Sequence, residues 1–552
     1  MIRSDLSALL AEGLSAAQAA GDIAKSPSVT FAVERREDDL ADYSSSEPMR
    51  LARVLGAAPK DIADVIVKHM PHSPSVRTAE VAGPGFINLW LKDEWVFNQL
   101  PEIHQAGPTF GHTDIGDGLR VQVEFVSANP TGPLTAGAGR GGVVGDALTR
   151  ILRAIGYEVT GEYYVNDAGY QVELLGLSVY HHYAAALGHE APFPTDGYLG
   201  DYISRWAAQI ADEDNDRWLN DEKPTKPSAF EARAVGIALN EIKRDLEDLN
   251  IEINSWFSEK SMRDRGDIES VLDSLEKGGH VTRRDGAVWF VGGDGVNDRE
   301  NVLVRSRGDP TYFAADIAYH QDKLERRNFD HVIDIWGADH HGHVPRVKAA
   351  MAALGVDREA SKLEILLTQM VGIRIDGELG RQGKRSGKFV TLRQLLDEVG
   401  PAATRYFFLS KAMDSQMVFD LELAKREDPE NPIYYIQMAH ARCAGIERTA
   451  KNIPAPEKSS NKNWLTKDDG ELLRLLLAFP EILVDAGMHR EPHRLTHYLL
   501  SLARTFHSYY NKHRVVTEDE SLTLQRLSLI GAVRQTFANG LELLGIDAPE
   551  RM

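Results

Sequence analysis

Apolar side chains with helical spacing mark the first segment of the chain. Leucines recur every three or four positions after Ser4: Leu6, Leu9, Leu10 and Leu14. This spacing predicts an amphipathic helix whose apolar face packs against another element. A glycine–proline turn then leads into a short apolar strand within residues 81–91, and a polar stretch follows at 107–118. We therefore predict an N-terminal α+β domain over residues 1–110.

Strict alternation of apolar and polar residues defines the next strand, over residues 119–126. Val121, Val123 and Phe125 alternate there with Gln122 and Glu124, as in a half-exposed strand. A loop rich in glycine and proline follows. The helix after it ends at Gly156 and has one apolar face: Val144, Leu148, Ile151 and Ile155. Residues 157–160 have the pattern of another strand, so the segment is a strand, glycine-rich loop, helix, strand unit.

The same order of elements returns near residue 330. Residues 330–336 predict a strand, 337–342 form a glycine-containing loop, and the helix after it runs to Gly355. Two such units indicate a Rossmann-type doubly wound parallel sheet over residues 111–400. Ligands bind such sheets at the carboxyl ends of the strands, where both loops would lie. The helix-rich, charged segment at about 180–280 is predicted to be an insertion between the two halves.

Strand patterns nearly vanish after residue 400. Apolar and aromatic residues recur there every three or four positions: Leu495, Leu499, Leu502, Phe506 and Tyr509. We predict an all-α helical bundle over residues 401–552, with this row in its core. The predicted fold class is therefore multidomain α/β, with an N-terminal α+β domain, a Rossmann-type sheet and a C-terminal helical bundle.

The composition limits which partners the protein can bind and which cell compartment suits it. The 552 residues include 62 Lys and Arg against 82 Asp and Glu, a net charge of −20, so any nucleic-acid site must be a local basic patch. Cys443 is the one cysteine of the sequence, which excludes an internal disulfide framework and a cysteine-rich zinc site. Asp5 and Glu12 interrupt the stretch that a signal peptide would keep apolar, and no run of 18 apolar residues occurs. We expect a cytoplasmic protein with no membrane partner and no structural metal.

Several longer motifs occur in one order along the chain. They are Val123–Leu134, Gly161–Gly169, Thr311–His320, Trp336–Gly342, Phe389–Leu392 and Asn431–Gln437, followed by the ending Ala548–Met552. Together they resemble the class I arginyl-tRNA synthetases along almost the whole sequence. The resemblance implies a Rossmann catalytic domain, an N-terminal domain that contacts the outer corner of tRNA, and a C-terminal anticodon-binding domain. It also implies ATP-dependent activation of arginine to arginyl-adenylate, transfer of arginine to tRNA(Arg), Mg²⁺ accompanying ATP, and a monomer.

The resemblance implies an arginine site. The residues that match it are Glu124, Ser127, Asn129, Tyr312, Asp316 and His340. Carboxylates at fixed positions suit the planar fork of a guanidinium and discriminate against lysine. Without the resemblance, Glu124 and Asp316 would more simply be solvated ends of a strand and a helix.

The resemblance also implies an ATP site at the ends of the two predicted strands. The residues that match it are Pro133, Gly137, Ala138, Gly337, Asp339, Met370 and Val371. The histidines in the loop at 337–343 are an alternative metal site, because imidazole is a common ligand. No complementary cysteine or carboxylate ligands lie nearby in the sequence, so we favour adenosine binding, and a structural role also suits one or more of these histidines.

Two signature motifs depart from the family pattern. Where the family has His-Val-Gly-His or a close variant, the chain reads Thr135-Ala-Gly-Ala138. Where the class has Lys-Met-Ser-Lys-Ser, and this family often has Arg-Met-Ser-Lys-Arg, it reads Arg381-Gln-Gly-Lys-Arg385. The catalytic candidates that remain are Thr135, Arg140, Lys384 and Arg385. Lys384 and Arg385 keep the positive charge needed as pyrophosphate leaves.

These departures leave two functions open. The first is an arginine–tRNA ligase, with activity reduced by the loss of both imidazoles. The second is a catalytically impaired or inactive relative, natural or deliberately disabled, that still binds tRNA or arginine. Consumption of ATP separates the two.

The polar face of the C-terminal bundle is the predicted tRNA-binding surface. Its candidates are Tyr434, Gln437, Arg442, Arg504, Lys512, Arg514 and Met552, which mix stacking groups with phosphate partners. In the N-terminal domain Asn88 is a further candidate for the tRNA contact, although a turn residue that closes a strand is the simpler explanation.

Overall fold

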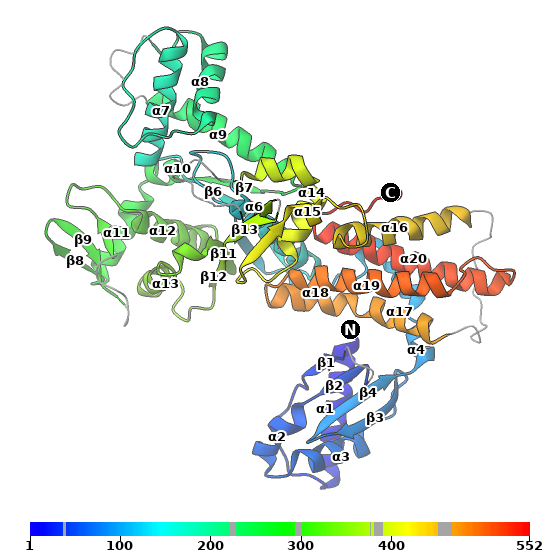
Figure 1. The fold of residues 1–552 in the computed structure, drawn as a ribbon. Helices are drawn as coiled ribbons and strands as arrows, with labels where there is room; N and C mark the ends of the chain where they lie inside the picture. The colour runs from blue at the N-terminus through cyan, green and yellow to red at the C-terminus, as the bar shows by residue number, and fades with distance from the viewer. Residues whose placement is uncertain (37–39, 220–227, 293–300, 376, 380–389, 451–465) are drawn as a thin grey trace.

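The computed structural model describes residues 1–36, 40–219, 228–292, 301–375, 377–379, 390–450 and 466–552. A parallel sheet lies at the centre, a helical insertion rises on one side, and a helical bundle extends on another (Figure 1). The N-terminal domain lies below the bundle. No helix in the described part of the chain is long and apolar enough to span a membrane.

The N-terminal domain packs helices on one antiparallel sheet of order β1-β2-β4-β3. Its elements are α1 (Ile2–Ala20), β1 (Val33–Arg35), β2 (Tyr43–Ser45), α2 (Glu47–Leu55), α3 (Pro59–His69), β3 (Val76–Ala82) and β4 (Phe86–Leu91), followed by α4 (Asp93–Phe97) and α5 (Leu100–Ala106). The helix predicted from the leucine spacing is α1, and Leu6, Leu10 and Leu14 are buried. Arg3 joins this domain to the bundle through paired hydrogen bonds to Asp485 of 2.7 and 3.0 Å.

The central sheet is parallel and has the order β12-β11-β5-β6-β7. Its strands are β5 (Arg120–Glu124), β6 (Glu158–Val165), β7 (Ser255–Ser258), β11 (His331–Gly337) and β12 (Leu363–Thr368). The chain passes from β5 through α6 (Ala136–Ala154) to β6 on one side, and from β11 through α13 (Val344–Ala353) to β12 on the other. The order therefore reverses between β5 and β11, so the loops after these two strands lie side by side.

Helix α6 lies close against β5 because it carries glycine at the contact. A Cβ added at Gly145 would lie 2.2 Å from Cγ of the buried Phe125 ring, whereas a Cβ at Gly141 would meet nothing within 4 Å. Only a residue without a side chain fits the first position. This approach fixes the helix that follows the glycine-rich loop.

Replacing Gly145 by alanine is therefore expected to destabilise the protein by overpacking, by about 1 to 3 kcal/mol. A lower urea midpoint of the unfolding transition, followed by circular dichroism, would measure it. Gly141→Ala is the matched control in the same helix, and it should leave the midpoint unchanged or raise it. Equal effects of the two substitutions would contradict the close packing described for Gly145.

The helical insertion contains α7 (Tyr170–Ala186), α8 (Asp201–Asp214) and α9 (Ser228–Asp248), which enclose a core of their own around Trp206 and Phe230. The chain then returns to the central sheet as β7, within the segment for which only an insertion was predicted. All four residues of β7 are half-buried. The strand therefore lacks the alternation of buried and exposed positions by which a strand is recognised in a sequence.

A smaller unit follows the insertion and leads into β11. It comprises α10 (Glu259–Asp264), α11 (Asp267–Lys277), β8 (Val281–Arg284), β9 (Ala287–Phe290), β10 (Val302–Val304) and α12 (Tyr312–Gln321). The strands form an antiparallel sheet of order β10-β9-β8. Helix α12 continues into a π-helical turn, η3 (Asp322–Arg326). Such turns redirect side chains and are frequent at functional sites.

The C-terminal part is mainly helical. Its elements are β13 (Val371–Ile375), β14 (Glu378–Leu379), α14 (Leu392–Leu409), β15 (Met417–Asp420), α15 (Leu421–Ala424), α16 (Pro432–Thr449), α17 (Lys467–Leu477), α18 (Phe479–Met488), α19 (His493–Lys512) and α20 (Glu520–Leu543). The predicted boundary at residue 400 falls on Gly400, where α14 is kinked. The short strand β15, which the sequence did not indicate, pairs with β13.

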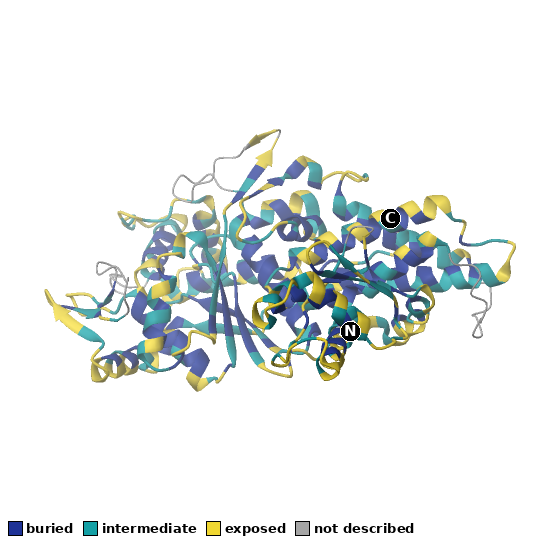
Figure 2. Ribbon diagram, turned by 90° about the horizontal axis from the view of Figure 1, so that it is seen from below, coloured by how far each residue is buried: buried dark blue, intermediate teal, exposed yellow. Residues whose placement is uncertain are grey.

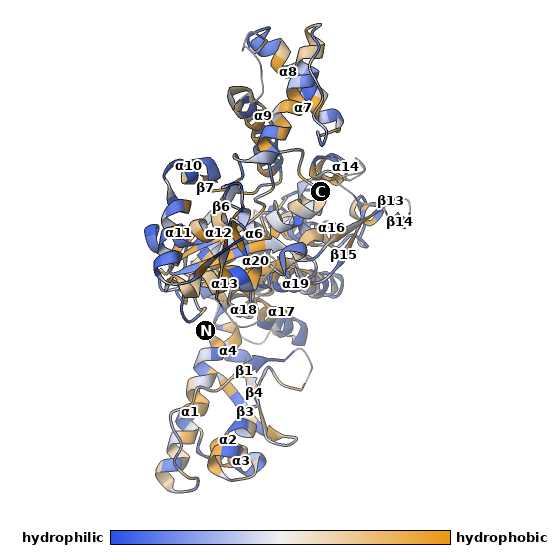
Figure 3. Cartoon of the chain, turned by 90° about the vertical axis from the view of Figure 1, so that its left-hand side faces the viewer, coloured by the Kyte–Doolittle hydropathy of each residue, from blue (hydrophilic) through white to orange (hydrophobic). Residues whose placement is uncertain are grey.

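The core runs from the N-terminal domain through the central sheet into the bundle. Figure 2 shows buried positions concentrated in the sheet and on the inner faces of the helices, and Figure 3 shows apolar residues gathered in the same places. The predicted row from Leu495 to Tyr509 in α19 is buried, which confirms its packing role.

One buried arginine joins four segments of the chain. Arg405 of α14 donates from Nε to the carbonyl of Leu544 at 2.6 Å, and from Nη1 to those of Leu249 and Asn250 at 2.9 and 3.1 Å. Its Nη2 lies 2.5 Å from Oδ2 of Asp146 in α6. The insertion, the bundle and α6 therefore share one guanidinium.

Candidate functional site

Three buried carboxylates form a row across the central sheet. Glu124 at the end of β5 pairs in register with Glu162 of β6 on one side and with Asp334 of β11 on the other. Adjacent strands lie about 4.8 Å apart, so the three carboxylates are neighbours. Each of these three residues is at most 5% exposed. A buried row of like charges is costly unless cations cover it.

Helix α12 and the π-helical turn supply the groups that cover the row, with Lys323 as the cation. Lys323 is fully buried, and its Nζ lies 2.6 Å from Oε2 of Glu124 and 2.7 Å from Oδ1 of Asp334. His320 lies 2.6 Å from the other oxygen of Asp334. Burial alone would raise the pKa of Asp334, but Lys323 and His320 lower it to about 2. Burial raises the pKa of Glu124, and Lys323 opposes that rise.

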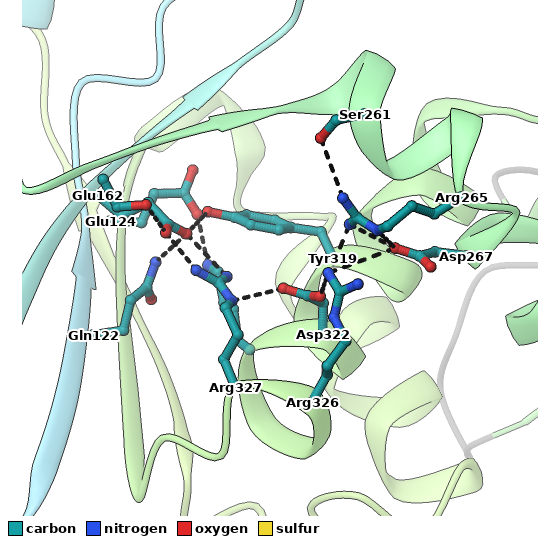
Figure 4. Close-up of polar contacts among 12 residues, drawn as sticks. Gln122, Glu124, Glu162, Ser261, Arg265, Asp267, Tyr319, Asp322, Arg326 and Arg327 are labelled. Atoms are coloured by element: carbon teal, nitrogen blue, oxygen red, sulfur yellow. Dashed lines mark hydrogen bonds and ion pairs between the residues drawn. The ribbon is translucent and has the colours of Figure 1, made fainter.

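The Glu162 end of the row has its own partners. Oε1 accepts hydrogen bonds from Gln122 at 2.9 Å and from the Tyr319 hydroxyl at 2.6 Å, and the Arg327 guanidinium pairs with both oxygens (Figure 4). Ser255 donates to Oε2 at 2.7 Å. Burial would raise the pKa of Glu162, but Arg327 lowers it below its ordinary value. This carboxylate is therefore held by protein groups.

A second group of acids lies beside the row, around the first turn of α12. Oδ2 of the buried Asp316 is 2.5 Å from Nε2 of His343. Glu259, at the start of α10, is buried and pairs with Arg263 at 2.5 and 2.8 Å. Tyr312 is half-exposed, and Asp316 raises the pKa of its hydroxyl, as do burial, Glu124 and Glu259 in that order. Two clusters of acids thus face one tyrosine at the mouth of the crevice.

The loop after β5 begins with a strained backbone. Val126 and Ser127 have φ values of 68° and 37°, in the left-handed region that β-branched residues rarely adopt. The hydroxyl of Ser127 accepts a hydrogen bond from the Tyr164 amide at 3.0 Å, which holds the turn. Strain of this kind gathers at functional sites, where the surrounding structure maintains it. It turns the chain sharply just after Glu124.

Farther along this loop the chain enters the first turn of α6. The Thr135 hydroxyl caps the helix by accepting from the Ala138 amide at 3.2 Å. A Cβ at Gly137 would meet only this hydroxyl, at 3.8 Å, so the first turn is open to a ligand. The amide of Leu392 donates to the carbonyl of Leu134 at 2.8 Å, which joins the loop to the start of α14. Lys384 and Arg385 lie outside the described residues.

Arg140, predicted to be catalytic, is fully buried behind the loop. Its Nη1 donates to the carbonyls of Gln369 and Ser415 at 3.1 and 3.0 Å, and its Nη2 donates to that of Ala412 at 2.8 Å. These contacts join α6 to the segments that flank β13 and β15. They favour a structural role, so we leave Arg140 out of the proposed reaction centre.

The remaining predicted ATP residues occupy the ends of neighbouring strands. Gly337 ends β11, and a Cβ there would lie 2.5 Å from the Asp339 carboxylate, so glycine makes room for that side chain. Met370 is 73% exposed beside the buried Val371, which begins β13. Pro133 lines a cavity of about 1210 Å³ between the loop after β5, the insertion and the start of α14.

Two other residues that were predicted to bind arginine make polar or ring contacts. The Asn129 side chain donates to Gln171 at 2.8 Å, and the His340 ring lies 6.0 Å from that of Trp336. Among the described residues, no group of three or more His, Cys, Asp or Glu side chains could hold a metal ion.

The predicted tRNA-binding residues lie in two places. On the bundle, Arg442 of α16 donates to His507 of α19 at 2.9 Å and its guanidinium lies 4.8 Å above the Tyr510 ring. Gln437 contacts the carbonyl of Asp547 at 3.0 Å. Tyr434 is half-buried, and the other members are exposed: Arg504, Lys512, Arg514 and Met552. In the N-terminal domain, the Asn88 side chain of β4 accepts from Ser44 at 2.9 Å.

The sequence missed two residues of this site. Lys323 is 199 residues from Glu124, and the π-helical turn that aims it carries no sequence signal. Glu259 follows β7, which was itself not predicted. Had β7 been recognised, an acid at the carboxyl end of a parallel strand would have been a candidate.

Models of known protein families match most of the chain. An arginyl tRNA synthetase N-terminal domain matches residues 4–91, a class I (R) tRNA synthetase catalytic domain matches 110–416, and a DALR anticodon binding domain matches 436–552. The catalytic-domain match extends to residue 416, past the boundary predicted at 400.

Curated relatives and solved structures cover the full length. The arginine–tRNA ligase of Moorella thermoacetica is 42% identical over 99% of this chain and 98% of its own, and that of Thioalkalivibrio sulfidiphilus is 39% identical over 100% of both. The structure of Thermus thermophilus arginyl-tRNA synthetase matches with a TM-score of 0.79 at 25% identity over 100% of both chains. That of arginyl-tRNA synthetase from Plasmodium falciparum matches with a TM-score of 0.75 at 16% identity, over 100% of this chain and 99% of its own, a likeness of fold.

Proposed function

Because this chain belongs to the arginyl-tRNA synthetase family of class I aminoacyl-tRNA synthetases, we propose that arginine and ATP react in the crevice between β5 and β11. The protein is an arginine–tRNA ligase, which uses ATP to join arginine to tRNA. The observation that carries the proposed site is the pair of buried acid clusters at this crevice, one at Glu124 and one at Asp316.

The guanidinium of arginine binds at Asp316, with Tyr312 and Glu259 beside it. A planar guanidinium donates paired hydrogen bonds to carboxylates, and buried carboxylates suit it better than the single ammonium of lysine. Asp316 and Glu259 are both buried, and Asp316 raises the pKa of Glu259, as burial does more strongly. An incoming cation relieves this repulsion, which favours a positively charged side chain.

The α-ammonium of arginine binds at Glu124. This residue ends the strand that leads directly into the nucleotide loop, so the reacting end of arginine lies next to the start of α6. Asn129 and Ser127 follow in the same turn. With its ends held by two acid clusters, arginine presents its carboxylate oxygen toward the α-phosphorus of ATP, an alignment that supplies much of the rate in such reactions.

ATP binds across the ends of β5 and β11, with Mg²⁺ accompanying it. The first turn of α6, at Gly137 and Ala138, suits phosphate because the helix dipole favours an anion and a Cβ at Gly137 would meet only the Thr135 hydroxyl. Gly337, Asp339, Met370 and Val371 contact the adenosine, and Pro133 flanks the loop. The arginine carboxylate attacks the α-phosphorus, pyrophosphate leaves, and Lys384 and Arg385 stabilise its charge. Thr135 holds the helix end through its capping hydrogen bond.

The tRNA binds along the helical bundle and the N-terminal domain of this chain, which acts as a monomer. The exposed cations Arg504, Lys512 and Arg514 contact phosphates, and Arg442, Gln437 and Tyr434 line the same part of the bundle. Met552 and Asn88 are outer contacts. The 3′ end reaches the crevice through the cavity lined by Pro133 and the insertion, where the terminal ribose takes arginine from the adenylate.

An ATP–pyrophosphate exchange assay tests this function. The purified protein is mixed with arginine, ATP, Mg²⁺, labelled pyrophosphate and tRNA(Arg), with filter binding of the tRNA measured in parallel. Exchange that depends on arginine is expected. Retained tRNA binding without exchange above background would instead establish the inactive relative that the altered motifs suggest.

Placing one imidazole in the first turn of α6 is expected to raise the exchange rate. An oxyanion donor is worth about 100- to 1,000-fold in another enzyme, and an added donor without preorganised partners should recover about tenfold or more for Ala138→His. The cap at Thr135 uses the backbone amide of residue 138, so the substitution keeps it. The kcat for exchange is the measurement, with Ala138→Leu, which has no hydrogen-bond donor, as control. A kcat for Ala138→His no higher than for Ala138→Leu would contradict a phosphate site at this turn.

A further inference from the structure

Lys323 contacts two of the three carboxylates in the row. In the part of the chain that the structure describes, its ammonium is the one hydrogen-bond donor to the Glu124 side chain, at 2.6 Å. The same ammonium also donates to Asp334 at 2.7 Å, and Lys323 is fully buried. The Tyr319 ring lies 4.0 Å beneath it, a cation–π contact that adds to the ion pairs. None of the sequence motifs assigns it a role.

Burying the Lys323 ammonium costs free energy, which argues that the residue does more than fill space in the core. Taking an ammonium out of water costs several kcal/mol unless ion pairs and hydrogen bonds return it. An apolar side chain would fill the same volume, and Arg327 already holds Glu162 at the other end of the row. What Lys323 adds is a fixed position and a retained charge for Glu124, which has no other donor among the described residues.

The charged groups around Glu124 leave one negative charge that a cationic ligand would neutralise. Asp334 and Glu124 together carry two negative charges, and Lys323 supplies one positive charge between them. The other titratable groups near this carboxylate come from three elements: Tyr312, Tyr319 and His320 of α12, Glu162 of β6 and Asp334 of β11. Arg327, which follows η3, pairs with Glu162. A substrate ammonium at Glu124 would complete the balance.

We propose that Lys323 is a positioning residue for arginine activation: it holds the Glu124 carboxylate ionised and aimed at the α-ammonium of arginine. The proposal rests on the assignment of Glu124 to the α-ammonium made above. Lys323 acts only through Glu124, so it affects the end of arginine that carries the ammonium and leaves the guanidinium end unchanged.

Kinetics of Lys323→Met with two ligands test this role. Arginine has both ends, whereas 5-guanidinopentanoate keeps the guanidinium and carboxylate but lacks the α-ammonium. The KM for arginine in the exchange assay is expected to rise by about tenfold or more, because burial favours the neutral form of Glu124 once its buried cation is removed. The inhibition constant of 5-guanidinopentanoate and the KM for ATP should stay within about twofold.

The pH profile and the conservative variant supply readouts that a structural role would not move. In Lys323→Met the KM for arginine should fall as the pH is raised above neutral, because Glu124 without its cation ionises only at higher pH. The parent should show no such fall. Lys323→Arg restores a cation and should recover most of the lost affinity.

Arg327→Met is the matched control, because it also removes a buried cation from the row. It should lower the melting temperature yet leave the KM for arginine within about twofold of the parent. If Lys323→Met does not fold, the variant Lys323→Met, Asp334→Asn removes the surplus carboxylate and takes its place. Its arginine KM should remain at least about tenfold raised, because burial alone keeps Glu124 protonated.

Two outcomes would overturn the proposal. One is an arginine KM for Lys323→Met, or for the double variant, within twofold of the parent. The other is an equal loss for arginine and for 5-guanidinopentanoate. Glu124→Gln separates these failures from failure of the proposed function: if it leaves the arginine KM unchanged, the assignment of Glu124 itself is wrong.

Discussion

Asp316→Asn is expected to lower kcat/KM for arginine by roughly 30- to 5,000-fold. Removing one partner of a buried, hydrogen-bonded charge pair costs about 2 to 5 kcal/mol, and here the substrate guanidinium is the partner. The substitution keeps the shape of the side chain and removes its charge. His343, 2.5 Å from Oδ2, still has an amide to contact, so the fold should hold. The exchange assay with varied arginine measures the loss.

The control for this substitution is Asp267→Asn. Asp267 pairs with Arg265 at the start of α11 and lies outside both acid clusters, so kcat/KM should stay at the parent value. The KM for ATP should also stay unchanged in Asp316→Asn. An arginine kcat/KM within threefold of the parent would place the guanidinium elsewhere.

The second large effect is on stability. Arg405→Met should lower the free energy of unfolding by about 3 to 5 kcal/mol, because it removes one of the two arginines that pair with the buried Asp146 and leaves the carbonyls of Leu249 and Leu544 without their donor. A guanidinium chloride titration followed by tryptophan fluorescence measures the change. The insertion and the bundle should both lose stability, since both supply carbonyls to Arg405.

Arg393→Met provides the comparison. Arg393 also joins the insertion to α14, through Asp245 and Asp248, but it is 37% exposed. Ion pairs at the surface contribute about 0 to 1 kcal/mol, so its loss should be small. A loss as large as that of Arg405→Met would show that burial does not decide the difference.

Local patterns in the sequence predicted the elements that have strong periodicity. The alternation around Val123 predicted β5, although both faces of this strand are buried and it is not half-exposed. The apolar face ending near Ile155 predicted α6, and the row in α19 is buried as expected. Strands β7 and β15 were missed because each has only four residues and gains its stability from a partner strand distant in sequence. Their formation depends on tertiary context, which overrides local preference.

The candidate site divides in the same way. Glu124 and Asp316 were named because they lie in motifs, and the structure buries both. Lys323 and Glu259 were not named, since their importance comes only from proximity in space. Arg140 shows the converse: the sequence placed it beside a phosphate loop, whereas its guanidinium is bound to three backbone carbonyls. A motif gives the position of a residue along the chain but not the direction of its side chain.

The Arg405 junction also bears on the order in which the protein folds during synthesis. Its guanidinium needs Leu249 and Asn250, made early, and Leu544, made almost 140 residues after Arg405 itself. The N-terminal domain can form as soon as it leaves the ribosome, since domains usually fold in order of synthesis. The centre of the molecule cannot be completed until residue 544 has emerged from the exit tunnel, so the nascent reaction centre matures last although its first strand is made in the first quarter of translation.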